Sequence, residues 1–184
     1  MMNDELELLK VVAKRLQNAG IEYMLTGSMA MAIYSIPRMT RDIDIILQVS
    51  LGDVGKIVAL FKNDFYIDED SVREAVMDKG MFKIISNDSV IKIDFIIRKE
   101  EYYRIEEFSR RHVVEIEGVP IAVVSPEDLV LSKLIRAKQS ESELQLRDVR
   151  QMTVGMKEID SAYLEKWAII LGVDDLLRKV KEHA

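Results

Sequence analysis

The chain has 184 residues, which is enough for one domain of ordinary size or for one domain with a small appendage. Hydrophobic residues make up 48% and charged residues 32%, and Gly and Pro number only 8 and 3, which excludes a disordered or collagen-like chain. With no Cys and 2 His, disulfides, thiolate zinc sites and cysteine nucleophiles are excluded, so any metal is expected on carboxylates. The net charge of -6 argues against a protein that coats nucleic acid indiscriminately, although it allows a local basic cleft.

The sequence shows no sign of a membrane segment or an export signal. No apolar run approaches the roughly 20 residues that a bilayer span requires. Residues 1–10 are acidic and lack the basic and then apolar pattern of a signal peptide. We therefore expect a cytoplasmic protein without membrane contacts.

The first half of the chain alternates between helical and extended patterns. Gly20 ends the first helical pattern, and Pro37 disfavours helical geometry in the residue before it, so the second helix cannot pass far beyond Ile36. Residues 26–28 form a turn between strand and helix. Helices are predicted over 4–19, 29–34 and 53–62, and strands over 21–25 and 42–49.

The second half begins with strands and ends with helices. Residues 86–89 and Gly118 connect neighbouring strands, and Ser125, Pro126 and Asp128 form a helix start in which Ser125 is the cap. Strands are predicted over 81–85, 90–97, 112–117 and 119–124, and helices over 126–138, 142–152, 160–171 and 174–182. The pattern predicts an α/β domain with a sheet over residues 1–124, followed by a helical C-terminal subdomain over residues 125–184.

Three aspartates interrupt the apolar strands. Residues two apart in a strand share a face, so Asp42 and Asp44 project together while Ile43 and Ile45 enter the core. Asp94 lies in an otherwise apolar strand, where a carboxylate is costly unless it joins such a cluster. Neighbouring carboxylates repel each other unless a cation neutralises them, and oxygen ligands suit Mg2+ or Mn2+.

The turn before the second helix offers an anion site. Backbone N–H groups of Gly27 and Ser28 and the helix dipole can hold a triphosphate. Three carboxylates on neighbouring strands can hold two metal ions about 4 Å apart, an arrangement suited to in-line displacement at phosphorus. These parts together match nucleotidyl transfer.

The ordered set Gly27-Ser28, Asp42-x-Asp44 and Asp94 resembles the nucleotidyltransferase superfamily related to DNA polymerase beta. The segment from Thr26 to Asp44 is similar to the minimal prokaryotic members, within which it resembles the abortive-infection toxins of type IV toxin–antitoxin systems. Further similarity lies downstream, in Ser125-Pro126-Glu127-Asp128-Leu129, Lys133 and Arg147-Asp148.

The resemblance implies a nucleotidyltransferase fold and a role for each matching residue. Asp42 and Asp44 would ligate metal, and Asp94 would be the third ligand and a base. Contacts to the nucleotide would come from Gly27, Ser28, Arg41, Lys133 and Asp148, where Asp148 would place Lys133 or the acceptor.

Structural alternatives exist for the peripheral residues. Lys133 could lie on the wet face of an amphipathic helix, and Arg147 with Asp148 could be a plain surface pair. Arg38 and Arg41 could contact phosphate or only balance local negative charge.

We therefore expect a metal-dependent enzyme that moves a nucleoside monophosphate from an NTP to a hydroxyl acceptor with release of pyrophosphate. The resemblance implies a tRNA 3′ end, a protein hydroxyl or a small molecule such as an aminoglycoside as acceptor, and a toxin with an antitoxin partner. The alternative is a module on the same fold that binds nucleotide or a partner without turnover.

Overall fold

A computed structural model describes residues 2–35, 42–155 and 159–182, and their contacts divide them into two compact units. The first unit comprises the described residues of 1–29 and 39–124, and the second those of 30–38 and 125–184. Each described helix is too short or too polar to traverse a bilayer.

The first unit is built on one mixed sheet. Its strand order is β3-β4-β5-β2-β1-β7-β6. The pairs β1–β7 and β2–β5 are parallel, and the other neighbours are antiparallel. The strands are β1 (Glu22–Thr26), β2 (Asp42–Gln48), β3 (Phe65–Tyr66), β4 (Met81–Ser86), β5 (Lys92–Ile97), β6 (His112–Ile116) and β7 (Val119–Val123). The predicted α/β fold with a sheet in this part of the chain is confirmed.

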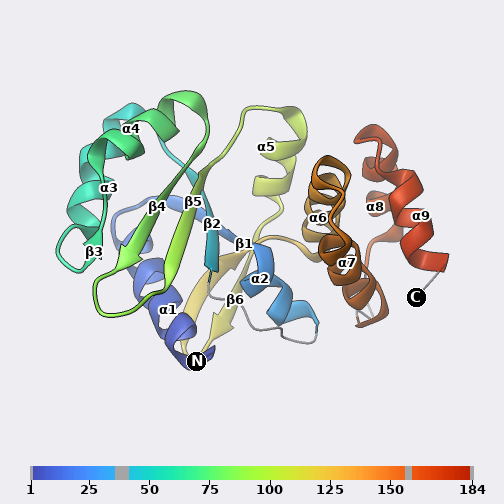
Figure 1. Cartoon of the computed structure of the whole chain (residues 1–184), viewed down its shortest axis with the longest axis horizontal. Coiled ribbons are helices and arrows are strands. Elements are labelled where there is room, and N and C mark those ends of the chain that lie inside the picture. The colour runs from blue at the N-terminus through green and yellow to red at the C-terminus, as the bar shows by residue number, and fades with distance from the viewer. Residues whose placement is uncertain (1, 36–41, 156–158, 183–184) are drawn as a thin grey trace. The chain divides into compact units, whose positions relative to one another are not determined.

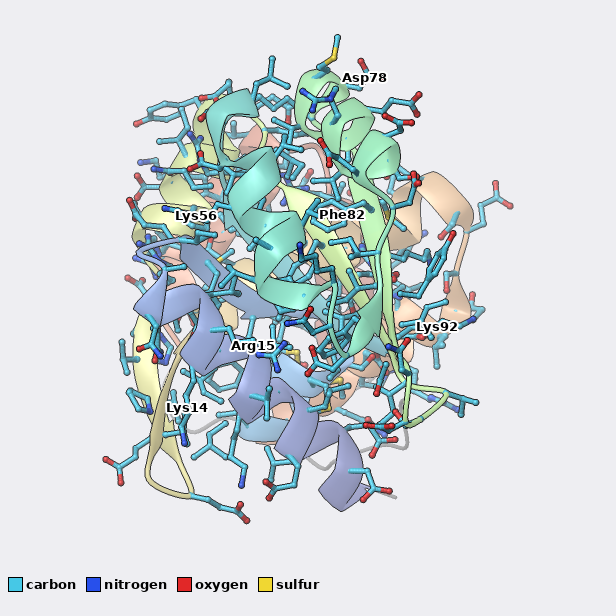
Figure 2. The ribbon with its side chains drawn as sticks, turned by 90° about the vertical axis from the view of Figure 1, so that its left-hand side faces the viewer. Lys14, Arg15, Lys56, Asp78, Phe82 and Lys92 are labelled. Carbon is cyan, nitrogen blue, oxygen red and sulfur yellow. The ribbon has the colours of Figure 1, made fainter. Side chains whose placement is uncertain are left out.

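Helices α1 (Met2–Asn18), α3 (Val54–Phe61) and α4 (Glu69–Asp78) pack against one face of this sheet (Figure 1). Every second residue along the strands is apolar and packs against these helices. For example, the ring of Phe61 on α3 lies 5.5 Å from that of Phe95 on β5. Arg15 of α1 lies beside the end of α3 (Figure 2), where it donates to the Leu60 carbonyl and to Asp64. The residues between these apolar positions in each strand therefore project from the opposite face of the sheet.

Three elements of the first unit have no counterpart in the sequence prediction. They are β3, α4 and α5 (Tyr102–Ser109). The other predicted elements of this unit are confirmed with small shifts of their ends. The second helix, α2 (Gly27–Tyr34), begins two residues earlier than expected, in the first unit, and continues into the second.

The second unit contains α6 (Pro126–Ser140), α7 (Glu143–Gly155), α8 (Ser161–Ile170) and α9 (Asp174–Glu182). The predicted cap is confirmed, because the Ser125 hydroxyl oxygen accepts from the Asp128 backbone N–H at 3.2 Å and donates to Asp128 Oδ2 at 2.6 Å. Tyr163 of α8 donates to the other oxygen of Asp128 at 2.8 Å, which ties α8 to the start of α6. Gly172, with a φ of +65°, separates α8 from α9, in agreement with the predicted helix ranges of 160–171 and 174–182.

Candidate active site

Four polar side chains form a line across the face of the sheet opposite α1, α3 and α4. Thr26 of β1 pairs with Asp44 of β2, Asp44 with Asp94 of β5, and Asp94 with Lys83 of β4. Paired residues on neighbouring strands share a face and have side chains about 5 Å apart at Cβ. We name Thr26, Asp44, Asp94 and Lys83 the carboxylate row. The sheet register thus brings together two of the three predicted aspartates.

The third aspartate, Asp42, lies on the same face, two residues before Asp44. Its partner on β5 is Lys92, which lies two residues before Asp94 and so on the same face of the sheet. The buried residues of β2 are Ile43, Ile45 and Leu47, so the alternation expected from the sequence is confirmed. This alternation fixes the direction of both Asp42 and Asp44.

Gly27 begins α2 in close contact with the carboxylate row. Its φ is +68°, a conformation that L residues other than Gly rarely adopt. A Cβ atom at residue 27 would lie 2.0 Å from Asp44 Oδ2 and 3.0 Å from Asp44 Cβ. Only glycine therefore lets the backbone at the start of α2 approach the Asp44 carboxylate, and Ser28 follows it in the first turn.

The two oxygens of Asp94 differ in their surroundings. Oδ2 lies 3.2 Å from the Lys83 ammonium nitrogen. Oδ1 is buried and accepts no hydrogen bond from any described residue. A buried acceptor without a partner is costly, which indicates a ligand position.

Lys83 is a residue that our sequence analysis missed. The sequence feature that could have identified it is the position of Lys83 between two apolar residues, Phe82 and Ile84, in the strand next to the one that contains Asp94. The pairing of Lys83 with Asp94 depends on the register of β4 against β5. Alternation places Lys83 on a face of the sheet but leaves registers that differ by two residues open.

The donors of this site fit a divalent cation. Carboxylate oxygens are the ligands that Mg2+ and Mn2+ prefer, and Mg2+ is commonly held by one or two carboxylates together with substrate phosphates. Within the described ranges, no three Asp, Glu or His side chains are gathered closely enough to hold an ion by themselves. The aspartates therefore fit a site that substrate oxygens would complete.

Lys133 and Asp148 lie in the second unit, where they form a buried ion pair. The Lys133 nitrogen lies 2.7 Å from Asp148 Oδ2, and the two side chains are 4% and 0% exposed. Gln145 Oε1 accepts from the same nitrogen at 3.4 Å. The alternatives of a wet-face lysine and a surface Arg147–Asp148 pair are wrong, because α6 and α7 pack on each other through these residues.

The arginines have different positions. Arg38 and Arg41 lie outside the described residues. Arg147 and Arg150 are exposed on α7 and line a hollow of about 300 Å³ with Glu143 and Leu144.

Comparison with known families identifies the type of protein. A family model described as a nucleotidyltransferase of unknown function (DUF6036) matches residues 2–182. No curated protein matches the chain.

Solved structures share the fold. An antigenic nucleotidyltransferase-like protein from Paracoccidioides brasiliensis has 17% identity and a TM-score of 0.61, with 97% of this chain and 93% of that chain covered. The antibiotic-resistance factor ANT(2'')-Ia has 15% identity and a TM-score of 0.59, with 100% and 99% covered. The lincosamide antibiotic adenylyltransferase LnuA, with lincomycin bound, has 11% identity and a TM-score of 0.54, with 82% and 95% covered.

Proposed function

We propose a reaction for this chain, which belongs to the DUF6036 family of nucleotidyltransferases: it moves a nucleoside monophosphate from an NTP to a hydroxyl group of an acceptor, with Mg2+ or Mn2+ as cofactor. Family membership establishes the class of enzyme and favours it over the non-catalytic binding module. The metal, the acceptor and the residue roles are our proposal.

The observation that carries the proposal is the contact of Gly27 with Asp44, beside Asp94 in the sheet. It brings the start of a helix, which favours anions, next to carboxylates that favour cations. A nucleoside triphosphate with its divalent cation presents both charges. Each half of the site therefore matches one part of this substrate.

Each proposed site residue of the first unit has a role in this reaction. Gly27 and Ser28 bind the triphosphate through backbone N–H groups, and Asp42, Asp44 and Asp94 hold the metal. The bound ion would supply charge stabilisation for the phosphoryl group during transfer. Asp94 also takes the proton from the acceptor hydroxyl, whose oxygen forms a bond to the α-phosphorus as the bond to pyrophosphate breaks.

We retain Lys133 as a phosphate ligand and Asp148 as the residue that positions it. The ion pair at 2.7 Å supports the positioning role, because Asp148, together with Gln145, holds the ammonium group in one place. Lys133→Ala is expected to weaken binding of the NTP but not of the nucleoside. Equal weakening of both would indicate a packing role only. Arg41 stays a proposed nucleotide contact.

We infer two candidate acceptors from different observations. ANT(2'')-Ia and LnuA are described as acting in antibiotic resistance or on a lincosamide antibiotic, which supports a small-molecule hydroxyl. Exposed arginines Arg136, Arg147 and Arg150 on α6 and α7 support an RNA acceptor such as tRNA. A protein hydroxyl stays open as the third class.

The proposed toxin role, with an antitoxin as partner, rests on the resemblance of the Thr26–Asp44 segment alone. Induced expression in a bacterial host tests it directly. Growth arrest by the wild type and normal growth with Asp44→Asn would support a toxin. Normal growth with both would contradict it.

The central experiment incubates the purified protein with Mg2+ or Mn2+, each α-labelled NTP, and separate RNA, protein and small-molecule fractions of a cell lysate. We expect label in one fraction with the wild type and none with Asp42→Asn or Asp44→Asn. Asp78→Asn is the matched control, because Asp78 is exposed at the end of α4 (Figure 2). Full labelling by both site variants would refute the site.

A further inference from the structure

We propose that Lys83 keeps a divalent cation from binding the carboxylates before the nucleotide arrives. This inference rests on the proposed function, because it concerns the same carboxylates. Lys83 Nζ lies 3.2 Å from Asp94 Oδ2 and so takes a place at this oxygen that a metal ion would need. The buried oxygen, Oδ1, is left for the ligand.

The strand geometry holds Lys83 in this place. Phe82 and Ile84 are buried on either side of it, so β4 cannot turn Lys83 to the other face without exposing the core. The antiparallel pair Lys83–Asp94 then sets the two Cβ atoms about 5 Å apart. The backbone is therefore fixed, and only the side chain of Lys83 is able to move.

Exposure distinguishes the two partners. The Lys83 side chain is 51% exposed, while that of Asp94 is 15% exposed. A lysine is a compact charge on a flexible four-carbon stem, so its ammonium group can leave Asp94 for water at small cost. Asp94 has no such freedom. Lys83 is therefore an exchangeable cation beside a fixed ligand.

Charge explains the consequence for metal binding. Asp44 and Asp94 are neighbours in the sheet, and Lys83 offsets one of their two negative charges. A divalent cation that approaches Asp94 is repelled by the ammonium group or must displace it. An NTP changes this balance, because its phosphates add ligands and negative charge. Metal and nucleotide are thus expected to bind together.

Removing the charge of Lys83 should therefore strengthen metal binding without nucleotide. We expect Lys83→Met to bind Mn2+ about tenfold more tightly than the wild type, as estimated from one unit charge acting on a dication across partly solvated space. Lys83→Arg should keep the wild-type affinity, because the positive charge is retained. Lys62→Met is the control, since Lys62 is exposed at the end of α3.

The measurement is a titration of each full-length variant with Mn2+, in which free Mn2+ is followed by electron paramagnetic resonance, with and without a non-hydrolysable NTP analogue. The analogue should raise the Mn2+ affinity of the wild type far more than that of Lys83→Met. Melting temperatures show that each variant is folded. A purely structural role for Lys83 would change the melting temperature and leave the Mn2+ affinity unchanged.

Two results would overturn the inference in distinguishable ways. If the wild type binds Mn2+, Asp94→Asn does not, and Lys83→Met binds no more tightly than the wild type, the role of Lys83 is refuted while the metal site stands. If the wild type binds no Mn2+ with or without the analogue, both the role of Lys83 and the proposed metal dependence are refuted.

Discussion

Replacing Gly27 by alanine tests the site through a single methyl group. The new Cβ would lie 2.0 Å from Asp44 Oδ2, 2.7 Å from its Cγ and 3.0 Å from its Cβ, so the Asp44 carboxylate must rotate away and the backbone must shift to relieve the contact with Cβ. The φ of +68° adds about 1–2 kcal/mol of backbone strain. We expect the folded protein to survive with this loss of stability, while nucleotide transfer falls about 100-fold or more, as when one preorganised group of an active site is removed.

Gly20→Ala is the matched control for this prediction. Gly20 has a φ of +66° and nothing within 4 Å of the position of its Cβ, so the substitution costs the same backbone strain without touching Asp44. Both variants should lose stability in urea unfolding, Gly27→Ala more because of the added clash with Asp44, and only Gly27→Ala should lose labelled transfer. Wild-type transfer by Gly27→Ala, or equal losses of transfer in both variants, would refute the argument that Gly27 admits the Asp44 carboxylate.

Two further predictions concern ion pairs outside the carboxylate row. Lys133→Met removes the cation that is paired with the buried Asp148 and should lower the free energy of unfolding by about 3–5 kcal/mol, whereas combining it with Asp148→Leu should recover most of this loss. Equal instability of the single and double variants would contradict this prediction. The second pair is part-buried: the Arg15 guanidinium donates a hydrogen bond to the Asp64 carboxylate and so lowers the pKa of Asp64. This stabilisation is present above the unfolded pKa of about 3.9 and is lost as pH falls through the lower folded value. Asp64→Asn should therefore reduce the melting temperature at pH 7 and make no difference near pH 2, and a constant difference across this range would exclude the linkage.

The sequence predicts strands and helices well where burial and polarity alternate cleanly. The strand with Asp42 and Asp44 shows this, because every second residue is apolar and enters the core. Helix α5 shows the opposite case, because charged Glu107 is buried there and accepts from Arg104 at 2.8 Å. A charged residue at a core position hides the helical period. Helix α4 was missed because its buried stripe contains only small side chains, namely Val72, Ala75 and Val76.

Some features of the candidate site can likewise be predicted from the sequence, and others cannot. The shared face of Asp42 and Asp44 follows from the strand period, and the turn at Gly27 follows from residue type. The contact of Gly27 with Asp44 and the pairing of Asp94 with Lys83 depend on how separate segments meet. The alternation of apolar residues excludes a slip of one residue, but it leaves registers that differ by two residues open. The carboxylates were therefore predictable from the sequence, and the lysine beside them was not.

Each unit contains a lysine–aspartate pair, and exposure gives the two pairs different properties. Lys133 and Asp148 are almost completely buried at 2.7 Å, so separating them leaves a charge in a medium of low polarity. Lys83 and Asp94 lie 3.2 Å apart with half of the lysine in water, so solvent can replace either partner. If the proposed function holds, a metal ion would exchange with Lys83, whereas a phosphate at Lys133 would share the ammonium group with Asp148. It follows that loss of Lys83 should act mainly on metal affinity, whereas loss of Lys133 should lower the stability of the helical unit as well as the affinity for NTP.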